Sequence, residues 1–160
     1  MAREEIVNRV AQKAGDFEEL FESCAQGTLF ALQEEFGLES SLVLKAATAM
    51  PGIALRGETC GAVVGSLMVL GVLYGRERPE DQEGFIRTLK AARKFCAAFE
   101  REFGSLMCND IHPSLLGRAY NFIDPAEAEA FRKAGGYKIC RTPPEKAARI
   151  VAEIILSQGK

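Results

Sequence analysis

The chain has 160 residues, 48% hydrophobic and 26% charged, and its 20 basic and 22 acidic side chains give a formal net charge of −2. This composition excludes a disordered or collagen-like protein, and the lack of excess positive charge argues against a nucleic-acid-binding protein. The length predicts a single domain over residues 1–160. Five cysteines beside a single histidine are the unusual feature of the composition.

The N-terminus and the apolar runs predict a protein without membrane insertion. Charges at positions 3, 4, 5 and 9 leave no room for the apolar stretch of a secretory signal. The longest uncharged run, Thr59–Gly75, has 17 residues and contains four glycines. A membrane span needs about 20 mostly apolar residues, so we expect a buried helix there. We therefore predict a cytoplasmic protein, in which the thiols stay reduced.

Apolar residues recur at helical spacing through the first half of the chain. This pattern predicts helices over residues 3–14, from 17 to about 36, over 40–49 and over 59–74. Gly15 is expected to end the first helix and Asp16 to cap the second, with Glu19 completing a capping box. Residues 51–58 are expected to form a loop that leads into the apolar helix.

The second half of the chain predicts a long amphipathic helix over 80–103, followed by irregular chain over 105–124 and a short helix over 125–134. The fragment Tyr137–Arg141 is strand-like but too short to support a sheet. Thr142 is expected to cap a final helix that has Pro143 in its first position. The sequence therefore predicts an all-α fold, a single compact domain of about seven helices.

Cys60 is the most informative cysteine, because it lies in the first turn of the predicted helix over 59–74. Unpaired backbone N–H groups and the helix dipole lower the pKa of a thiol there, as a redox nucleophile and a metal ligand both require. The small residues Gly61 and Gly65 allow a neighbouring helix or a cofactor to approach. The alternative is a tight helix contact in which Cys60 is a small hydrophobic residue.

The other cysteines differ in their predicted positions. Cys24 falls in the middle of a predicted helix, which by itself indicates the core, and Cys96 lies on the apolar stripe of the long helix. Cys108 and Cys140 stand at the ends of elements near glycines, where thiols are better placed to converge on one site. His112 follows Cys108 by four residues, but the proline after it disfavours a helix, so we expect a solvent-facing or capping histidine.

The order of these cysteines carries a family resemblance. The segment reads Cys60-Gly-Ala-x-x-Gly65, an upstream Cys24-Ala-Gln precedes it, and Cys108 and Cys140 follow in order. This pattern resembles the signature of the C_GCAxxG_C_C family, small redox-active proteins named for their cysteines. Around Cys24 only the Cys-Ala part of the expected Gly-Cys-Ala element is present, and Cys96 matches no cysteine of the family. The resemblance implies a redox or metal-linked role.

Three functions are compatible with these residues. The first is an electron-transfer protein that binds an iron–sulfur cluster through Cys24, Cys60, Cys108 and Cys140, since four thiolates are the usual ligands of such a cluster and of structural zinc. The second is a cofactor-free oxidoreductase in which Cys60 attacks as a thiolate and another of the four resolves the disulfide. The third is a non-redox structural or interaction module, with or without zinc.

We favour the first of these functions, the iron–sulfur protein. Both redox functions predict a redox partner protein. A cofactor at the site would lie against the ligand cysteines, Gly61 and Gly65. The apolar helix over 59–74 is also a candidate contact for a homodimer, which is common among helical proteins of this size.

Overall fold

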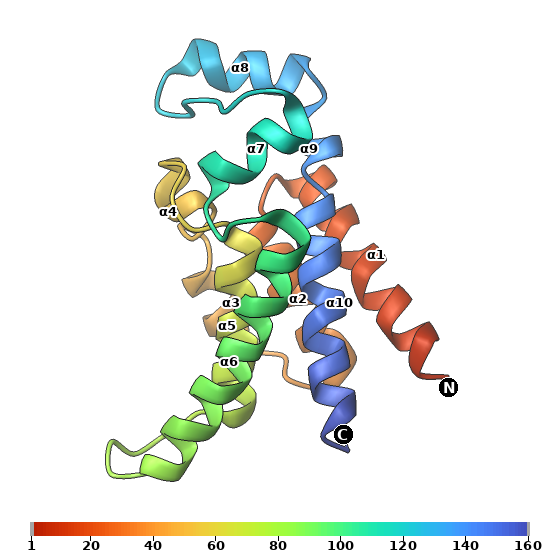
Figure 1. The fold of residues 1–160 in the computed structure, drawn as a ribbon, viewed down its shortest axis with the longest axis vertical. Coiled ribbons are helices and arrows are strands. Elements are labelled where there is room, and N and C mark those ends of the chain that lie inside the picture. The colour runs from red at the N-terminus through yellow and green to blue at the C-terminus, as the bar shows by residue number, and fades with distance from the viewer. Residues whose placement is uncertain (1, 160) are drawn as a thin grey trace.

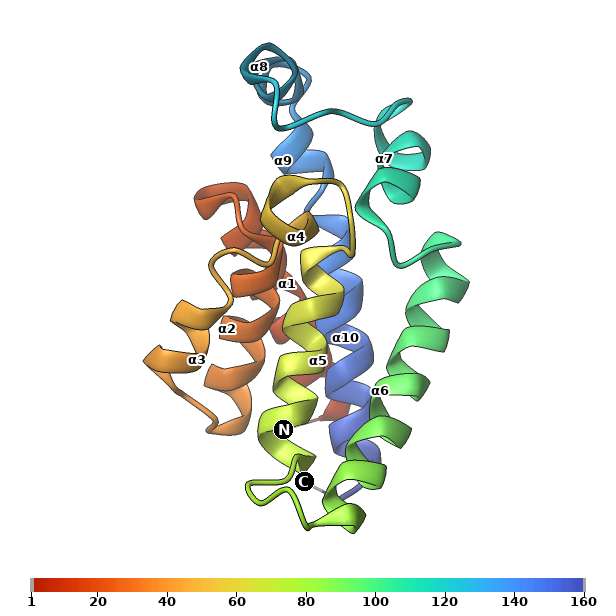
Figure 2. The same cartoon turned by 90° about the vertical axis from the view of Figure 1, so that its left-hand side faces the viewer.

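The computed structural model describes residues 2–159, and the all-α prediction is confirmed. Within these residues there is no strand, and seven helices have seven or more residues. Helices α1 (Arg3–Phe21), α2 (Cys24–Phe36), α5 (Gly61–Tyr74) and α10 (Thr142–Ser157) pack against one another as a bundle, and α6 (Gln82–Phe103) packs on α5 and α10 (Figures 1 and 2).

The shorter elements are α3 (Ser41–Ala46), α4 (Gly52–Leu55), α7 (Cys108–Leu116), α8 (Pro125–Lys133) and α9 (Gly136–Ile139). Helices α4, α7, α8 and α9 gather at one end of the bundle in both views, and the chain termini lie toward the other end (Figures 1 and 2). At the gathered end α1 finishes while α2, α5 and α10 begin. Several helix N-termini therefore meet in one place.

The core consists of the apolar faces of the five longest helices. Fully buried side chains come from α2, α5, α6 and α10, among them Leu29, Leu70, Phe95, Phe99 and Ile155. Helix α5 has the most apolar sequence because it contacts α2, α6 and α10 at once. In the described part of the chain, no helix combines the length and the apolar character that crossing a bilayer requires.

The structure corrects the first predicted helix boundary. Helix α1 continues through Gly15, and α2 starts at Cys24 after the cap Ser23, whose Oγ accepts a hydrogen bond from the Gln26 N–H at 3.4 Å. A Cβ on Gly15 would lie 2.6 Å from Cγ of Glu145, so the glycine permits close packing of α10 and does not end a helix. Cys24 is therefore at a helix N-terminus, and the prediction of a mid-helix position is wrong.

Two later segments also differ from the prediction. The region over 105–124 contains α7, and the strand-like fragment is mostly the helical turn α9, with Cys140 as its C-cap. Pro113 lies inside α7, which tolerates it because the start of the helix is fixed by tertiary hydrogen bonds. Helix α10 begins at Thr142, one residue from the predicted cap, which is an ordinary uncertainty in a helix boundary.

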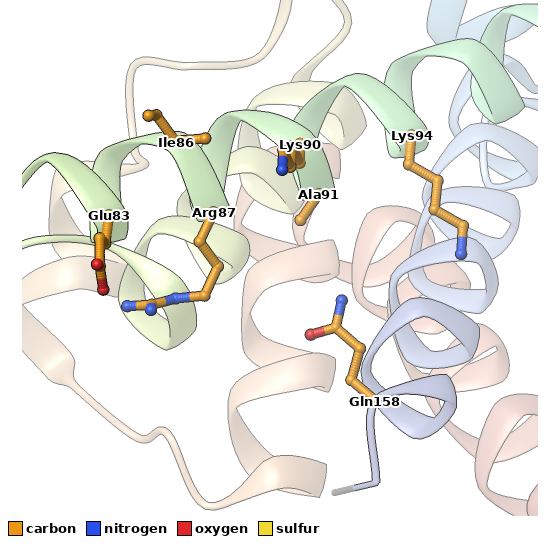
Figure 3. A pocket seen from close by; sticks show the side chains of 7 residues that line it. All are labelled: Glu83, Ile86, Arg87, Lys90, Ala91, Lys94 and Gln158. Atoms are coloured by element: carbon orange, nitrogen blue, oxygen red, sulfur yellow. The ribbon is translucent and has the colours of Figure 1, made fainter.

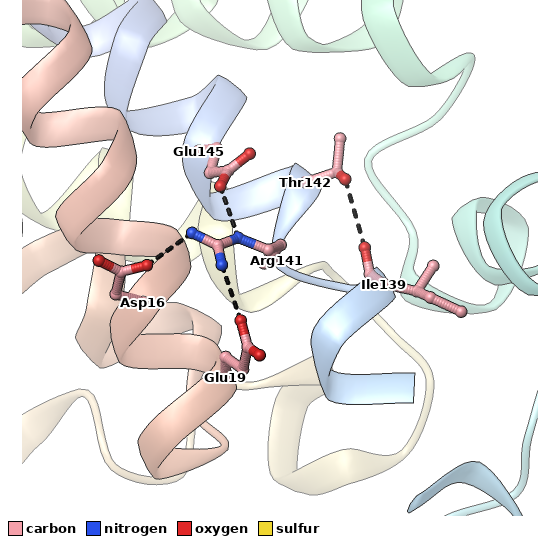
Figure 4. A network of polar contacts seen from close by, with 6 residues as sticks. All are labelled: Asp16, Glu19, Ile139, Arg141, Thr142 and Glu145. Carbon is pink, nitrogen blue, oxygen red and sulfur yellow. Dashed lines mark hydrogen bonds and ion pairs between the residues drawn. The ribbon is translucent and has the colours of Figure 1, made fainter. Parts of the chain in front are cut away.

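Arg141 joins the start of α10 to the end of α1 (Figure 4). Its Nε donates to Glu145 at 2.7 Å, Nη1 to Glu19 at 2.7 Å and Nη2 to Asp16 at 2.6 Å. The hydrogen bonds and charges of Glu145 and Asp16 raise the pKa of the guanidinium. Asp16 and Glu19 thus bind an arginine of another helix and do not form the predicted capping box.

We expect Arg141→Met to lower the free energy of unfolding by about 1–3 kcal/mol, because it leaves three carboxylates without their common cation. Chemical denaturation at low salt measures the loss, which should shrink in 1 M salt as the charges are screened. Arg149→Met is the matched control, since Arg149 also joins α10 to α1 but contacts only one carboxylate, the exposed Glu4 at 3.7 Å, besides a 2.7 Å hydrogen bond to the neutral Asn8. Equal losses for the two variants would contradict the expectation.

Candidate functional site

Four of the five cysteines meet at the end of the bundle where the short helices gather. Cys24 opens α2, Cys60 is the N-cap of α5, Cys108 opens α7 and Cys140 ends α9. Cys24, Cys108 and Cys140 line a common cavity of about 30 Å³, and the Cys24 sulfur packs against Gly61, the residue next to Cys60. Cys96 lies half-buried on α6 against the core, as predicted. All five are free thiols.

Two extended backbone segments hold Cys60 next to the start of α7. The Cys60 N–H donates to the Leu106 carbonyl at 2.8 Å, and the Cys108 N–H donates to the Glu58 carbonyl at 2.7 Å. The next bond runs from the Asn109 N–H to the Gly57 carbonyl at 3.0 Å. These hydrogen bonds connect residues about fifty positions apart, so only the tertiary structure places the two cysteines together.

A left-handed turn borders the cavity. Gly52, Ile53, Ala54 and Leu55 have φ values of 53°, 49°, 56° and 59°. L-residues in this region cost about 1–2 kcal/mol each, and a run of three is rare. Gly52 and Leu55 line the cavity, so the strained backbone forms part of its wall. Strain of this kind is concentrated at functional sites, where the surrounding structure holds it.

The two glycines after Cys60 make room for α2. A Cβ on Gly61 would lie 2.5 Å from the Cys24 Sγ and 2.9 Å from the Pro51 Cα. A Cβ on Gly65 would overlap the Ala25 carbonyl oxygen. The neighbour that approaches these glycines is therefore helix α2, and Gly61 in particular leaves space for the Cys24 sulfur.

The pKa values of Cys24 and Cys60 are shifted in opposite directions. The hydrogen bond with Cys24 lowers the pKa of Cys60 against the opposing effect of burial, and the backbone N–H groups of Ala62 and Val63 lower it further. The same hydrogen bond, together with burial and the charge of Glu18, raises the pKa of Cys24 well above its ordinary value. Cys60 is therefore the thiol of the pair that loses its proton more readily, and Cys24 is the one that keeps its proton.

Glu18 is a site residue that the sequence did not indicate. Its side chain lines the cavity, only 3% of the residue is exposed, and Oε2 has no hydrogen-bond partner in the described structure. Burial raises the pKa of Glu18 to about 8, with smaller contributions from the charges of Cys60 and Glu22. The sequence predicted that the first helix ends at Gly15. Glu18 was therefore not expected at the site, which it reaches because α1 continues to Phe21.

His112 is buried, and the prediction of a solvent-facing or capping histidine is wrong. Its Nε2 lies 3.3 Å from the Cys108 Sγ and 3.8 Å from the Cys140 Sγ. The ring stacks on Phe131 with 5.6 Å between centroids. Burial lowers the pKa of His112, which favours the neutral imidazole. The four-residue spacing from Cys108 was a valid signal, because α7 continues through Pro113.

The site does not have the donor arrangement of a bound metal. Across residues 2–159, no three His, Cys, Asp or Glu side chains are arranged as a metal site. The Cys24 sulfur packs against Gly61 beside Cys60, whereas the sulfurs of Cys108 and Cys140 contact His112. The cavity between them has room for one or two water molecules. As they are arranged, these residues do not fit an iron–sulfur cluster or zinc, and both cofactors stay predictions.

A wider groove, of about 470 Å³, lies away from the cysteines (Figure 3). Residues of α6 and Gln158 line it, and the cationic side chains are Arg87, Lys90 and Lys94. No thiol or imidazole is among the lining residues. The chemistry of the molecule is therefore concentrated at the cysteine-bearing end.

A comparison with protein families finds one match that covers most of the chain. Residues 22–154 match the family model described as "Putative redox-active protein (C_GCAxxG_C_C)". The matched region contains the four converging cysteines and both glycines after Cys60. Comparisons with curated proteins and with solved structures find no match.

Proposed function

Because the chain belongs to the C_GCAxxG_C_C family, whose description is redox activity, we propose that it is a dithiol–disulfide redox protein whose reacting pair is Cys24 and Cys60. One observation carries this proposal: the Cys24 sulfur packs against Gly61, directly beside Cys60, which is the N-cap of α5 and has a lowered pKa. A stabilised thiolate next to a second thiol is the reactive unit of disulfide oxidoreductases.

The reaction exchanges two electrons with a disulfide, R–S–S–R. The reactive form has Cys60 as the thiolate and Cys24 as the thiol. Transfer of the Cys24 proton to Cys60 frees the Cys24 sulfur, which attacks the substrate disulfide, forms a Cys24–S–S–R bond and releases RS⁻. Cys60 then loses the proton and attacks the Cys24 sulfur, forming the Cys24–Cys60 disulfide and releasing a second RS⁻. The dithiol is oxidised, the substrate is reduced to two thiol equivalents, and the proton passes to one of them.

Exposure supports this division of roles. Cys24 is half-buried and faces the cavity, whereas only 4% of Cys60 is exposed. The accessible sulfur meets the substrate, and the buried thiolate resolves the mixed disulfide. In the reverse direction a substrate thiolate attacks Cys24, and Cys60 departs readily because a thiol of low pKa is a good leaving group.

The partner is a thiol or disulfide of a protein or small molecule, in keeping with the predicted reducing cytoplasm.

The test is site-resolved alkylation between pH 5 and pH 10 in a Cys96→Ser background. The alkylation rate of Cys60 should reach half its maximum below the pKa of a free thiol, about 8.5, and that of Cys24 above it. Burial slows alkylation of Cys60 at every pH, so the midpoints are compared and not the rates. Cys24→Ala removes the hydrogen-bond donor and should raise the Cys60 midpoint by about one pH unit or more.

Three results would overturn the proposal. A Cys60 midpoint equal to that of a free thiol, unchanged in Cys24→Ala, would show that neither Cys24 nor the helix activates it. Stoichiometric iron and sulfide in anaerobically prepared protein, with visible absorption that bleaches on reduction, would replace the dithiol with a cluster protein. Zinc bound by the same thiols would favour the structural module.

A further inference from the structure

We propose that Cys108 and Cys140 form a second redox-active dithiol, with His112 as their shared base, that exchanges electrons with the Cys24–Cys60 pair across the cavity. This inference rests on the proposed function for its oxidant, the Cys24–Cys60 disulfide. It assigns a second reaction to the site and gives the protein a capacity of four electrons.

The geometry places both sulfurs on one imidazole nitrogen. Nε2 of His112 lies 3.3 Å from the Cys108 Sγ and 3.8 Å from the Cys140 Sγ, so the two sulfurs share a single contact atom. Cys108 is half-buried and Cys140 is buried, which repeats the pattern of Cys24 and Cys60. Each pair thus has one accessible sulfur and one sheltered sulfur.

His112 is suited to take a proton from either thiol. The ring is 2% exposed, and packing on Phe131 holds it in place. Its Nδ1 is buried without a hydrogen-bond partner in the described structure, so the proton can move between the ring nitrogens without breaking a bond to a neighbour. With the proton on Nδ1, Nε2 is free to accept from a thiol.

The cavity determines which sulfurs of the two pairs meet. Cys24, Cys108 and Cys140 line it, and Cys60 does not. In the oxidised first pair, Cys24 is therefore the sulfur open to attack from Cys108. Cys60 is then the leaving thiolate, the role that its position at the start of α5 favours.

Two thiol–disulfide exchange steps transfer two electrons from the second pair to the first. Cys108 gives its proton to His112 and attacks the Cys24 sulfur, breaking the Cys24–Cys60 bond and forming Cys24–Cys108. Cys140 then attacks the Cys108 sulfur, forming Cys108–Cys140 and freeing Cys24. The second pair loses two electrons and the first pair gains them. Of the two thiol protons, one ends on Cys24 and the other leaves through His112 to solvent, while Cys60 stays a thiolate.

The experiment maps disulfides by mass spectrometry after oxidation with glutathione disulfide, in a Cys96→Ser background. The four-cysteine protein should yield Cys24–Cys60 and Cys108–Cys140. A variant that also carries Cys24→Ser and Cys60→Ser should still form Cys108–Cys140. Cys60→Ala with Cys140→Ala should form Cys24–Cys108, while the matched control, Cys24→Ala with Cys108→Ala, should leave both remaining cysteines reduced.

The outcomes separate this inference from the proposed function. In one outcome the Cys24–Cys60 disulfide forms, but Cys108 and Cys140 stay thiols or each bind glutathione. This outcome would overturn the second dithiol alone. Cys108–Cys140 forming without Cys24–Cys60 would refute the first pair and the exchange between pairs. Melting curves check the fold, and alanine replaces serine in any variant that unfolds.

His112→Gln tests the shared base. In the variant with Cys24→Ser and Cys60→Ser, it should slow Cys108–Cys140 formation at pH 7 by about tenfold or more and move the pH profile toward higher pH. A purely structural histidine would change the melting temperature without moving that profile. An unchanged pH profile in a folded variant would remove His112 from the mechanism.

Discussion

Glu18→Gln is expected to stabilise the protein at neutral pH. Below pH 4.5 both the folded and the unfolded state hold the Glu18 proton, so the carboxyl has no effect on stability. Between pH 4.5 and about 8 the unfolded chain releases the proton that the folded state keeps, and stability falls by about 1.4 kcal/mol per pH unit. Glutamine has no proton to release, so the variant should be more stable by about 3 kcal/mol at pH 7.

Urea denaturation at pH 4.5, 6, 7 and 8 with a reductant present measures this effect. The wild type and Glu18→Gln should be similar at pH 4.5 and diverge steadily as the pH rises. Glu129→Gln is the control, because Glu129 is exposed on α8 and its side chain is 54% accessible. A constant difference between wild type and Glu18→Gln over this range would show that Glu18 ionises normally in the folded state.

Gly65→Ala is expected to lower the free energy of unfolding by about 1–3 kcal/mol, because the added Cβ overlaps the Ala25 carbonyl oxygen and α2 must move away. This loss corresponds to a decrease in Tm of about 2–12 °C for a protein of this size. The backbone of α2 cannot rotate aside as a flexible side chain would, so the strain is not relieved locally.

Gly71→Ala is the matched control in the same helix. Nothing lies within 4 Å of a Cβ at Gly71, so the substitution only removes the helix penalty of glycine and should stabilise by about 0.5–1 kcal/mol. The two alanine variants should therefore shift Tm in opposite directions. Equal Tm values would mean that the close contact between α2 and α5 does not constrain Gly65.

The sequence predicted the long helices because their pattern is local. The helix over 80–103 and the apolar helix over 59–74 were placed within two residues, since hydrophobic spacing and the adjacent glycines are properties of neighbouring residues. The family resemblance was also confirmed, because the order of the cysteines is a property of the sequence and needs no knowledge of the fold. The assignment of Cys96 to the packing of α6 also followed from its position on the apolar stripe.

The boundary between α1 and α2 could not be predicted in this way. Gly15 and Asp16 have the local chemistry of a helix end and a cap, but Gly15 is required by the approach of Glu145, and Asp16 binds Arg141. Both partners lie more than a hundred positions away in the chain. Because the boundary was misplaced, Cys24 was predicted to be a core residue in the middle of a helix, whereas it is the first residue of α2.

The sequence alone determined the all-α fold and the four cysteines of the site. Only the tertiary structure decided which of those cysteines lie together: Cys24 beside Cys60, and Cys108 and Cys140 against His112. It also added Glu18, which is buried on the wall of the same cavity. Helix periodicity reflects contacts between residues three and four apart, whereas the site forms from helix ends that meet only when the bundle closes, so its pairing is not encoded in any single segment.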